Sequence, residues 1–140
     1  MADIQLTFHH LGLATPTPEE AQRFLTGLGY RFGETIWDPL QKVHLSWGRS
    51  EVMPDVEIIS PGEEPSPIDA LIKKNRSHIY HTCYEVASIE AAVAELEAAG
   101  NRLLPLAPPK PAILFDHRLV AFFMVAGFGV IELLQCTDPA

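Results

Sequence analysis

The stretch that decides the fold is residues 8–30, "FHHLGLATPTPEEAQRFLTGLGY", because a second copy of its pattern occurs later in the chain. Residues 79–101 read "IYHTCYEVASIEAAVAELEAAGN", and the two passages align with a shift of 71 positions. In both, a histidine (His10 or His81) precedes a glycine by nineteen residues. Each passage runs from an apolar strand pattern, through a Thr or Ser suited to a helix N-cap, to a helical pattern that the glycine ends. The repeat predicts that each half of the chain begins with a strand and a helix.

Strand patterns follow each of these glycines, since β-branched and aromatic residues alternate with polar ones between turn signals. In the first half they are "YRFGETIW", "KVHLSWG" and "VEIIS"; in the second they are "RLLPL", "RLVAFFM" and "GVIELLQ". Each half is therefore predicted to be a βαβββ module within one α+β domain spanning residues 1–140. We expect the first module at about 6–60, a connector with a short helix at 61–76, and the second module at about 77–136.

A proline-rich stretch interrupts the second half between Pro105 and Asp116, "PLAPPKPAILFD". Proline has no N–H to donate, so this stretch is incompatible with a helix or a central strand. We predict a loop, and its length of about a dozen residues is typical of loops with a function.

Composition excludes several classes of protein. The chain has 140 residues, 47% of them hydrophobic, and a net charge of −8. Its ten Lys and Arg residues argue against a nucleic-acid partner. No apolar run is long enough for a membrane span, and no export signal is visible at the N-terminus. We therefore expect a cytoplasmic protein without a membrane or nucleic-acid partner.

Each half ends in a strand that carries one acid among apolar residues, Glu57 in "DVEIIS" and Glu132 in "GVIELLQ". Burying an unpaired carboxylate costs several kcal/mol or forces its protonation, so these acids need a compensating partner. Glu57 follows His10 by 47 residues, and Glu132 follows His81 by 51. The two halves thus place a histidine on the first strand and a glutamate on the last at nearly the same spacing.

These four residues are candidate metal ligands. Taken singly, a strand histidine is usually part of the core and a strand glutamate usually faces solvent. Two imidazoles and two carboxylates at symmetric positions instead suit a divalent cation: zinc, nickel, cobalt, manganese or Fe(II), which the ligand types do not distinguish. Neighbours on a strand point to opposite faces, so only one residue of the His9–His10 pair can face the metal. The repeat selects His10, and His9 is expected on the other face, against the helices or a partner subunit.

With these residues in hand, the sequence resembles the vicinal oxygen chelate superfamily, and within it the methylmalonyl-CoA epimerases. The resemblance covers about residues 8–135 and rests on motifs in the order "HHLGLA", "VEIISP", "SPIDALIKKN", "IYHTCYEVASIEAAVAELEAAG" and "GVIELLQ". It implies paired βαβββ modules that form a cup-shaped mixed sheet around a divalent metal. The ligands it implies are His10, Glu57, His81 and Glu132.

The resemblance also implies a chemistry. A metal that binds a carbonyl oxygen stabilises an enolate, and a nearby base can then move the α-proton. Epimerisation needs two acid/base groups. One is implied to be Glu132, and the other a glutamate on the third strand of the first half, where the nearest residue is His44. His44 is either a base, since an imidazole titrates near neutral pH, or a polar wall of the pocket.

The leading functional interpretation is a metal-dependent epimerase or isomerase that forms an enolate from a carbonyl compound or a CoA thioester. A glyoxalase I-like lactoylglutathione lyase shares the implied ligand set and is the first alternative. The second alternative is a non-catalytic protein that binds a hydrophobic small molecule between two subunits. A homodimer is expected in each case.

Overall fold

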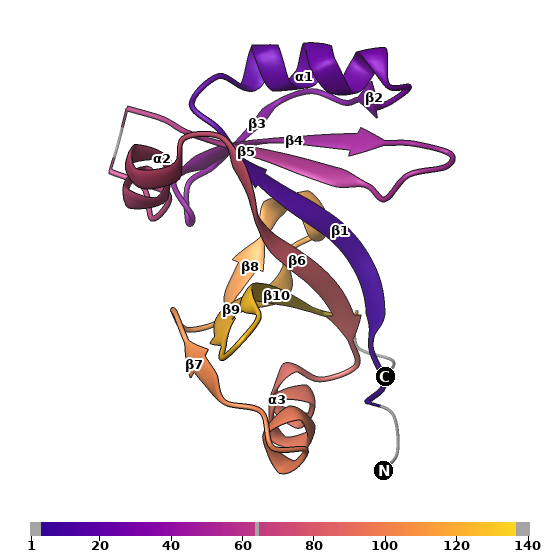
Figure 1. Ribbon diagram of the computed structural model, residues 1–140, viewed down its shortest axis with the longest axis vertical. Helices are drawn as coiled ribbons and strands as arrows, with labels where there is room; N and C mark the ends of the chain where they lie inside the picture. The colour runs from indigo at the N-terminus through magenta and orange to yellow at the C-terminus, as the bar shows by residue number, and fades with distance from the viewer. Residues whose placement is uncertain (1–3, 64, 137–140) are drawn as a thin grey trace. The chain divides into compact units, whose positions relative to one another are not determined.

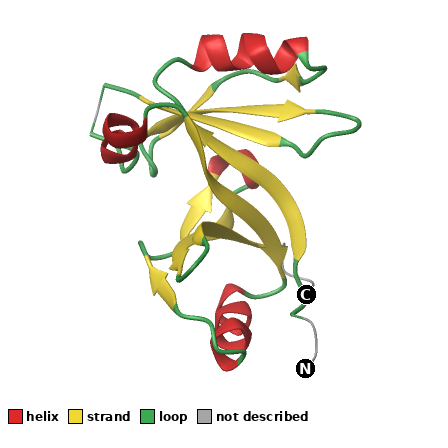
Figure 2. Cartoon of the chain, viewed as in Figure 1, coloured by secondary structure: helices red, strands yellow, loops and turns green. Residues whose placement is uncertain are grey.

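The computed structural model describes residues 4–63 and 65–136, which form ten strands, three α-helices and one 3-10 turn (Figures 1 and 2). In chain order the elements are β1 (Thr7–Ala14), α1 (Pro18–Gly27), β2 (Arg31–Phe32), β3 (Ile36–Asp38), β4 (Val43–Arg49), β5 (Val56–Pro61), α2 (Asp69–Asn75), β6 (His78–Val86), α3 (Ile89–Ala98), β7 (Leu103–Pro105), β8 (Lys110–Ala112), η1 (Ile113–Phe115), β9 (Arg118–Val125) and β10 (Gly129–Gln135). No helix within these residues is both long and apolar enough to cross a membrane.

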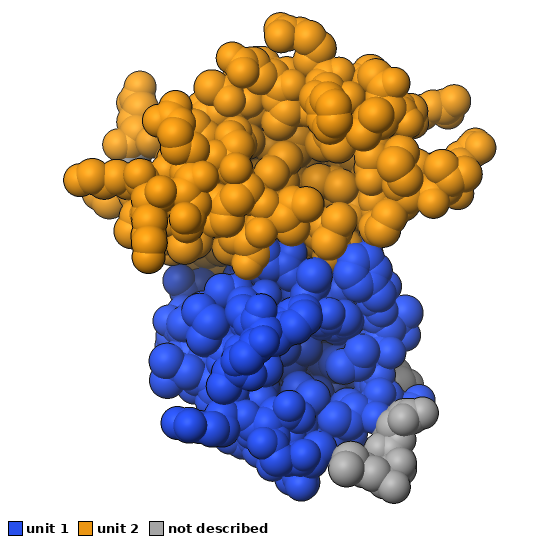
Figure 3. All heavy atoms as spheres, in the orientation of Figure 1, with its two compact units in different colours: residues 1–9, 81–140 blue, residues 10–80 orange. Residues whose placement is uncertain are grey.

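The chain divides into two compact units (Figure 3). Unit 2 is residues 10–80, and unit 1 is residues 81–140 together with residues 1–9. The boundaries fall inside β1 and β6, so each of these strands begins in one unit and ends in the other. The halves identified from the repeat therefore correspond to the units except at these two strands.

The sheet of unit 2 is mixed. β1 runs parallel to β5, β5 is antiparallel to β4, and both β2 and β3 pair with β4. One face of this sheet packs against α1 through a core of Tyr30, Val56 and Ile58, with apolar side chains of α1 and β1 around it. Side chains alternate between faces along each strand, so the residues on either side of Ile58 point away from α1.

The sheet of unit 1 has the same construction. β6 runs parallel to β10, β10 is antiparallel to β9, and both β7 and β8 pair with β9. One face packs against α3, whose Ile89 and Ala92 join Phe123, Ile131 and Leu133 in the core. The two units therefore repeat one plan: a strand, a helix, an interrupted strand, and a hairpin that returns beside the first strand.

The local sequence explains where α1 and α3 begin and end. Thr17 and Ser88 occupy the N-cap positions, as predicted, and the Ser88 hydroxyl accepts a hydrogen bond from the N–H of Ala91 at 3.2 Å. Two residues after the last helical residue stand Gly29 and Gly100, with φ of +108° and +96°. Such left-handed backbone favours glycine and ends a helix.

The predicted α+β class and the βαβββ pattern are confirmed, with two corrections. "YRFGETIW" is not one strand but two, β2 and β3, which both lie opposite β4. The stretch from Pro105 to Asp116 is not entirely loop, because it contains β8 and η1. Within the described residues β8 pairs only with β9, and proline is tolerated in such an edge strand.

Candidate metal ligands in the two units

In unit 2, His10 of β1 and Glu57 of β5 form a buried pair. Glu57 lies opposite Gly12 in the parallel pairing of β1 with β5, and His10 stands two residues before Gly12, on the same face. The His10 Nε2 atom is 3.6 Å from Glu57 Oε1, and the two residues are 0% and 4% exposed. The pair lies on the face of the sheet opposite to α1.

In unit 1, His81 of β6 and Glu132 of β10 form the corresponding pair. Glu132 lies opposite Cys83, and His81 stands two residues before Cys83. His81 Nε2 is 3.1 Å from Glu132 Oε1, and both residues are 2% exposed. The repeat in the sequence has thus led to the same histidine–glutamate contact in each unit.

An aromatic residue accompanies each pair, and sequence reasoning missed it. Trp47 lies opposite Glu57 across the β4–β5 hairpin, and its ring meets the His10 ring edge-on, with 4.9 Å between centroids. In unit 1, Phe122 lies opposite Glu132 and meets His81 in the same way at 5.2 Å. A signal was present, because each aromatic residue precedes its glutamate by ten positions. Both rings hold an imidazole in place and keep water from it.

The donor types of the pairs fit a divalent cation. Each pair offers one imidazole nitrogen and one carboxylate oxygen, the mixed set that zinc, nickel, cobalt, manganese and Fe(II) accept. A buried carboxylate is stable only with a compensating positive charge or hydrogen bonds. A bound divalent ion would supply this positive charge to the buried carboxylates of the two pairs.

His44 lies on the other face of β4 from Trp47, and its role as a base or as a polar wall of the pocket stays a prediction. In β4 it pairs with Ser60 of β5, whereas Glu57 pairs with Trp47. Since 44 and 47 differ by an odd number of residues, His44 points to the face that packs against α1. There its ring lies against the Trp37 ring, with 4.8 Å between centroids. The positions of β4 on the ligand-bearing face are Val43, Leu45 and Trp47.

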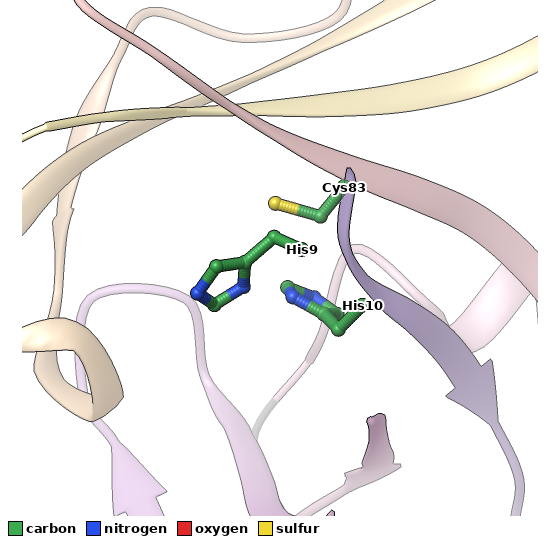
Figure 4. A group of neighbouring side chains, drawn as sticks. All are labelled: His9, His10 and Cys83. Atoms are coloured by element: carbon green, nitrogen blue, oxygen red, sulfur yellow. The ribbon is translucent and has the colours of Figure 1, made fainter. Parts of the chain in front are cut away.

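His9 precedes His10 on β1, and Figure 4 shows its ring beside that of His10 and near the Cys83 sulfur. Its ring meets the Phe115 ring of η1 edge-on at 5.3 Å, and a ring nitrogen of His9 lies within 4.8 Å of the Cys83 sulfur. Both contacts are within unit 1. Within unit 1, His9 therefore packs against the 3-10 turn and β6, and its predicted place against the helices or a partner subunit stays a prediction.

Comparison with known proteins defines the class. Residues 9–122 match the glyoxalase/bleomycin resistance protein/dioxygenase superfamily, and the chain belongs to this family. It is 33% identical over 118 residues to an ethylmalonyl-CoA/methylmalonyl-CoA epimerase of Cereibacter sphaeroides, covering 78% of this chain and 86% of that protein. It is 30% identical over 120 residues to the mitochondrial methylmalonyl-CoA epimerase of Dictyostelium discoideum, covering 81% and 68% of the two chains.

A solved structure has the same fold. The methylmalonyl-CoA epimerase of Mycobacterium tuberculosis matches with a TM-score of 0.77 and 18% identity, covering 99% of this chain and 94% of that one. The resemblance to the superfamily noted from the sequence is thereby confirmed.

Proposed function

We propose that this protein is a divalent-metal-dependent enzyme that moves a proton at the carbon next to the carbonyl of an acyl-CoA thioester, in the manner of an epimerase. Family membership and the two relatives named as epimerases support the reaction class. The observation that carries the proposal is the pairing of a buried histidine with a buried glutamate, beside an aromatic ring, in both units.

The proposed ligands are His10, Glu57, His81 and Glu132, all holding one ion. When bound, the metal would supply Lewis-acid stabilisation of the negative charge that develops on the thioester oxygen as the α-proton leaves. Two neutral imidazoles and two carboxylates balance the charge of a divalent ion, so the occupied site is neutral. The Trp47 and Phe122 rings pack edge-on against the two imidazoles, which are buried.

Glu132 is the proposed base. Its carboxylate lies 3.1 Å from an imidazole nitrogen and is 2% exposed, so it is held in a fixed position away from bulk water. A carboxylate held in this position can take up a proton from carbon and return it. A positioned base of this kind contributes about 10² to 10⁴ in rate.

Inversion needs a second proton donor on the opposite face of the substrate carbon, and unit 2 offers little for it. The ligand-bearing face of β4 carries Val43 and Leu45, both 3% exposed, and His44 lies on the other face. This observation favours a second candidate: a proton shift within one substrate by a single base, as in a glyoxalase I-like reaction on a hemithioacetal of glutathione.

Proton exchange into methylmalonyl-CoA in deuterated water, followed by NMR and by the chirality of the product, tests the first candidate. Metal-loaded wild type should exchange the α-proton, and Glu132→Gln should not. Exchange with retained chirality, together with turnover of methylglyoxal and glutathione, would select the single-base candidate. No turnover of either substrate, with no metal after purification without chelator, would contradict both and favour a binding protein. Sedimentation of the same samples tests the expected homodimer.

A further inference from the structure

Unit 2 carries an open cleft that the candidate metal ligands do not use. It has a volume of about 690 Å³ and lies where β2 begins and β4 ends. Two arginines line it together with apolar and acidic side chains: Arg31, Arg49, Leu28, Phe32, Val52 and Glu51. The chain has ten basic residues against eighteen acidic ones, so two arginines in one cleft are a local exception to its charge.

The two arginines face each other directly. Arg31 of β2 lies opposite Arg49 of β4, in the register that places their side chains on one face of the sheet. Like charges opposite one another on neighbouring strands repel and destabilise the pairing. Within residues 4–63 and 65–136, no ion pair involves either arginine. An anion bound between the two guanidinium groups would remove the repulsion.

The cleft is built on a well-fixed scaffold. The Ser50 hydroxyl accepts hydrogen bonds from the N–H groups of Val52 and Met53, at 3.2 and 3.0 Å, which sets the turn after β4. The Tyr30 hydroxyl, next to Arg31, donates to the carbonyl oxygen of Pro54 at 2.7 Å and ties β2 to the end of that turn. The backbone beside both arginines is therefore held by hydrogen bonds.

The arginine pair shares a sheet face with the ligand pair. Glu57 lies opposite Trp47, and Arg49 follows Trp47 by two residues, so both side chains point to the face of His10. Two residues of strand span about 7 Å, and Arg31 lies one strand further, about 5 Å to the side. A ligand with one end at Glu57 could thus reach the arginines along the face of a single sheet.

We propose that Arg31 and Arg49 bind the phosphate groups of the coenzyme A part of the substrate, an inference that rests on the proposed function. Coenzyme A joins a thioester-forming arm to a diphosphate, a ribose phosphate and an adenine. Arginine binds phosphate through paired, charge-assisted hydrogen bonds. The apolar side chains of Leu28 and Val52, which line the same cleft, provide a surface for the adenine or the arm. The negative charge of the Glu51 carboxylate repels the same phosphate groups and should weaken their binding.

Calorimetric binding of free coenzyme A to the intact protein tests the inference without requiring turnover. Replacing both arginines, Arg31→Gln with Arg49→Gln, should weaken binding at least about tenfold, because the loss of even one charge-assisted contact is expected to cost that much. Arg102→Gln, an exposed arginine of unit 1 outside the cleft, should change it less than twofold. Glu51→Gln should bind more tightly. The thermal midpoint of each variant is recorded beside its affinity.

A second measurement compares substrates. The N-acetylcysteamine thioester of methylmalonate lacks every phosphate, so its kcat/KM should be the same in wild type and in the double arginine variant. With methylmalonyl-CoA, KM should rise at least about tenfold in the variant while kcat changes little.

The inference is overturned if wild type does not bind coenzyme A, if the double variant binds it as tightly as wild type, or if the truncated thioester loses as much kcat/KM as the full one. Binding that depends on the arginines without any proton exchange would instead contradict the proposed function and leave the cleft assignment intact.

Discussion

Units 1 and 2 use one plan to place a histidine beside a glutamate, but they differ in the charged groups beyond that pair. The His–Glu contact and the edge-on aromatic ring recur in both. Beyond the pair, unit 1 has an Arg118–Glu85 ion pair at 2.6 Å, whereas unit 2 has two arginines facing each other at an open cleft. The comparison teaches that the repeated backbone fixes the candidate ligands, while the surrounding charges are free to differ between the halves.

Substitution of Glu57 and Glu132 tests most directly whether the two units contribute equivalent groups. If Glu132 is both ligand and base, Glu132→Gln should lower α-proton exchange by about 10² to 10⁴. Glu57→Gln keeps an oxygen that can coordinate metal and should retain most of kcat once metal is saturating. Initial rates at several metal concentrations separate the two effects. Equal losses of kcat in both variants would show that the units contribute equivalent groups.

Metal retention compares His10 with its neighbour. His10→Ala should lower metal affinity more than the 10–100-fold typical of losing an outer-shell partner, because a donor atom itself is removed. His9→Ala is the matched control, since His9 packs against Phe115 and should leave metal bound. Metal content after dialysis, measured by elemental analysis, checks both. Retention by His10→Ala would contradict the ligand assignment.

The cores of the two units test whether they unfold together. Leu133 in unit 1 and Ile58 in unit 2 are 0% and 1% exposed, and truncating either to alanine should cost about 2–5 kcal/mol. We predict a single domain, so each variant should show one urea transition shifted as a whole. Two transitions, of which each variant moves only one, would show that the units are independent.

The sequence was sufficient for the features that local chemistry sets. The shift of 71 residues located α1 and α3, with their N-caps and terminal glycines, and the alternation of apolar and polar residues located the strands that carry Glu57 and Glu132. Features that depend on pairing between distant segments could not be derived from the sequence in this way. The face on which His44 lies depends on the register of β4 with β5, and an error of one residue reverses it. The same holds for β8, which is a strand because β9 lies beside it.

Helix capping offers a smaller test of the repeat. The Ser88 hydroxyl caps α3, whereas the Thr17 side chain makes no cap bond to α1 and lies 3.4 Å from the Thr15 hydroxyl. Ser88→Ala should therefore cost about 1 kcal/mol, and Thr17→Ala less than half of that. Urea unfolding of the two variants compares them directly. Equal costs would mean that the bond to Ala91 contributes nothing.

The Tyr30 hydroxyl is expected to make the stability of unit 2 depend on pH. Burial raises the pKa of its hydroxyl above 10.0, and the nearby Asp55 carboxylate adds to the rise. The contribution of Tyr30 to stability is fully present below the unfolded pKa of about 10 and is lost as pH rises through the folded value. Tyr30→Phe should lower the free energy of unfolding by about 1 kcal/mol at pH 7. Between pH 7 and pH 11 the free energy of unfolding of this variant should fall less than that of wild type. Identical pH slopes would contradict the assignment.

The interrupted strands have a consequence for how the protein behaves at high concentration. β2 and β3 lie end to end beside β4, and β7 and β8 do the same beside β9, each piece two or three residues long. A long, unbroken edge strand offers a template on which another chain can add and start a fibril. Short pieces, with Pro105 and Pro111 among them, offer no such template. A design that joined either pair into one continuous strand would be expected to aggregate.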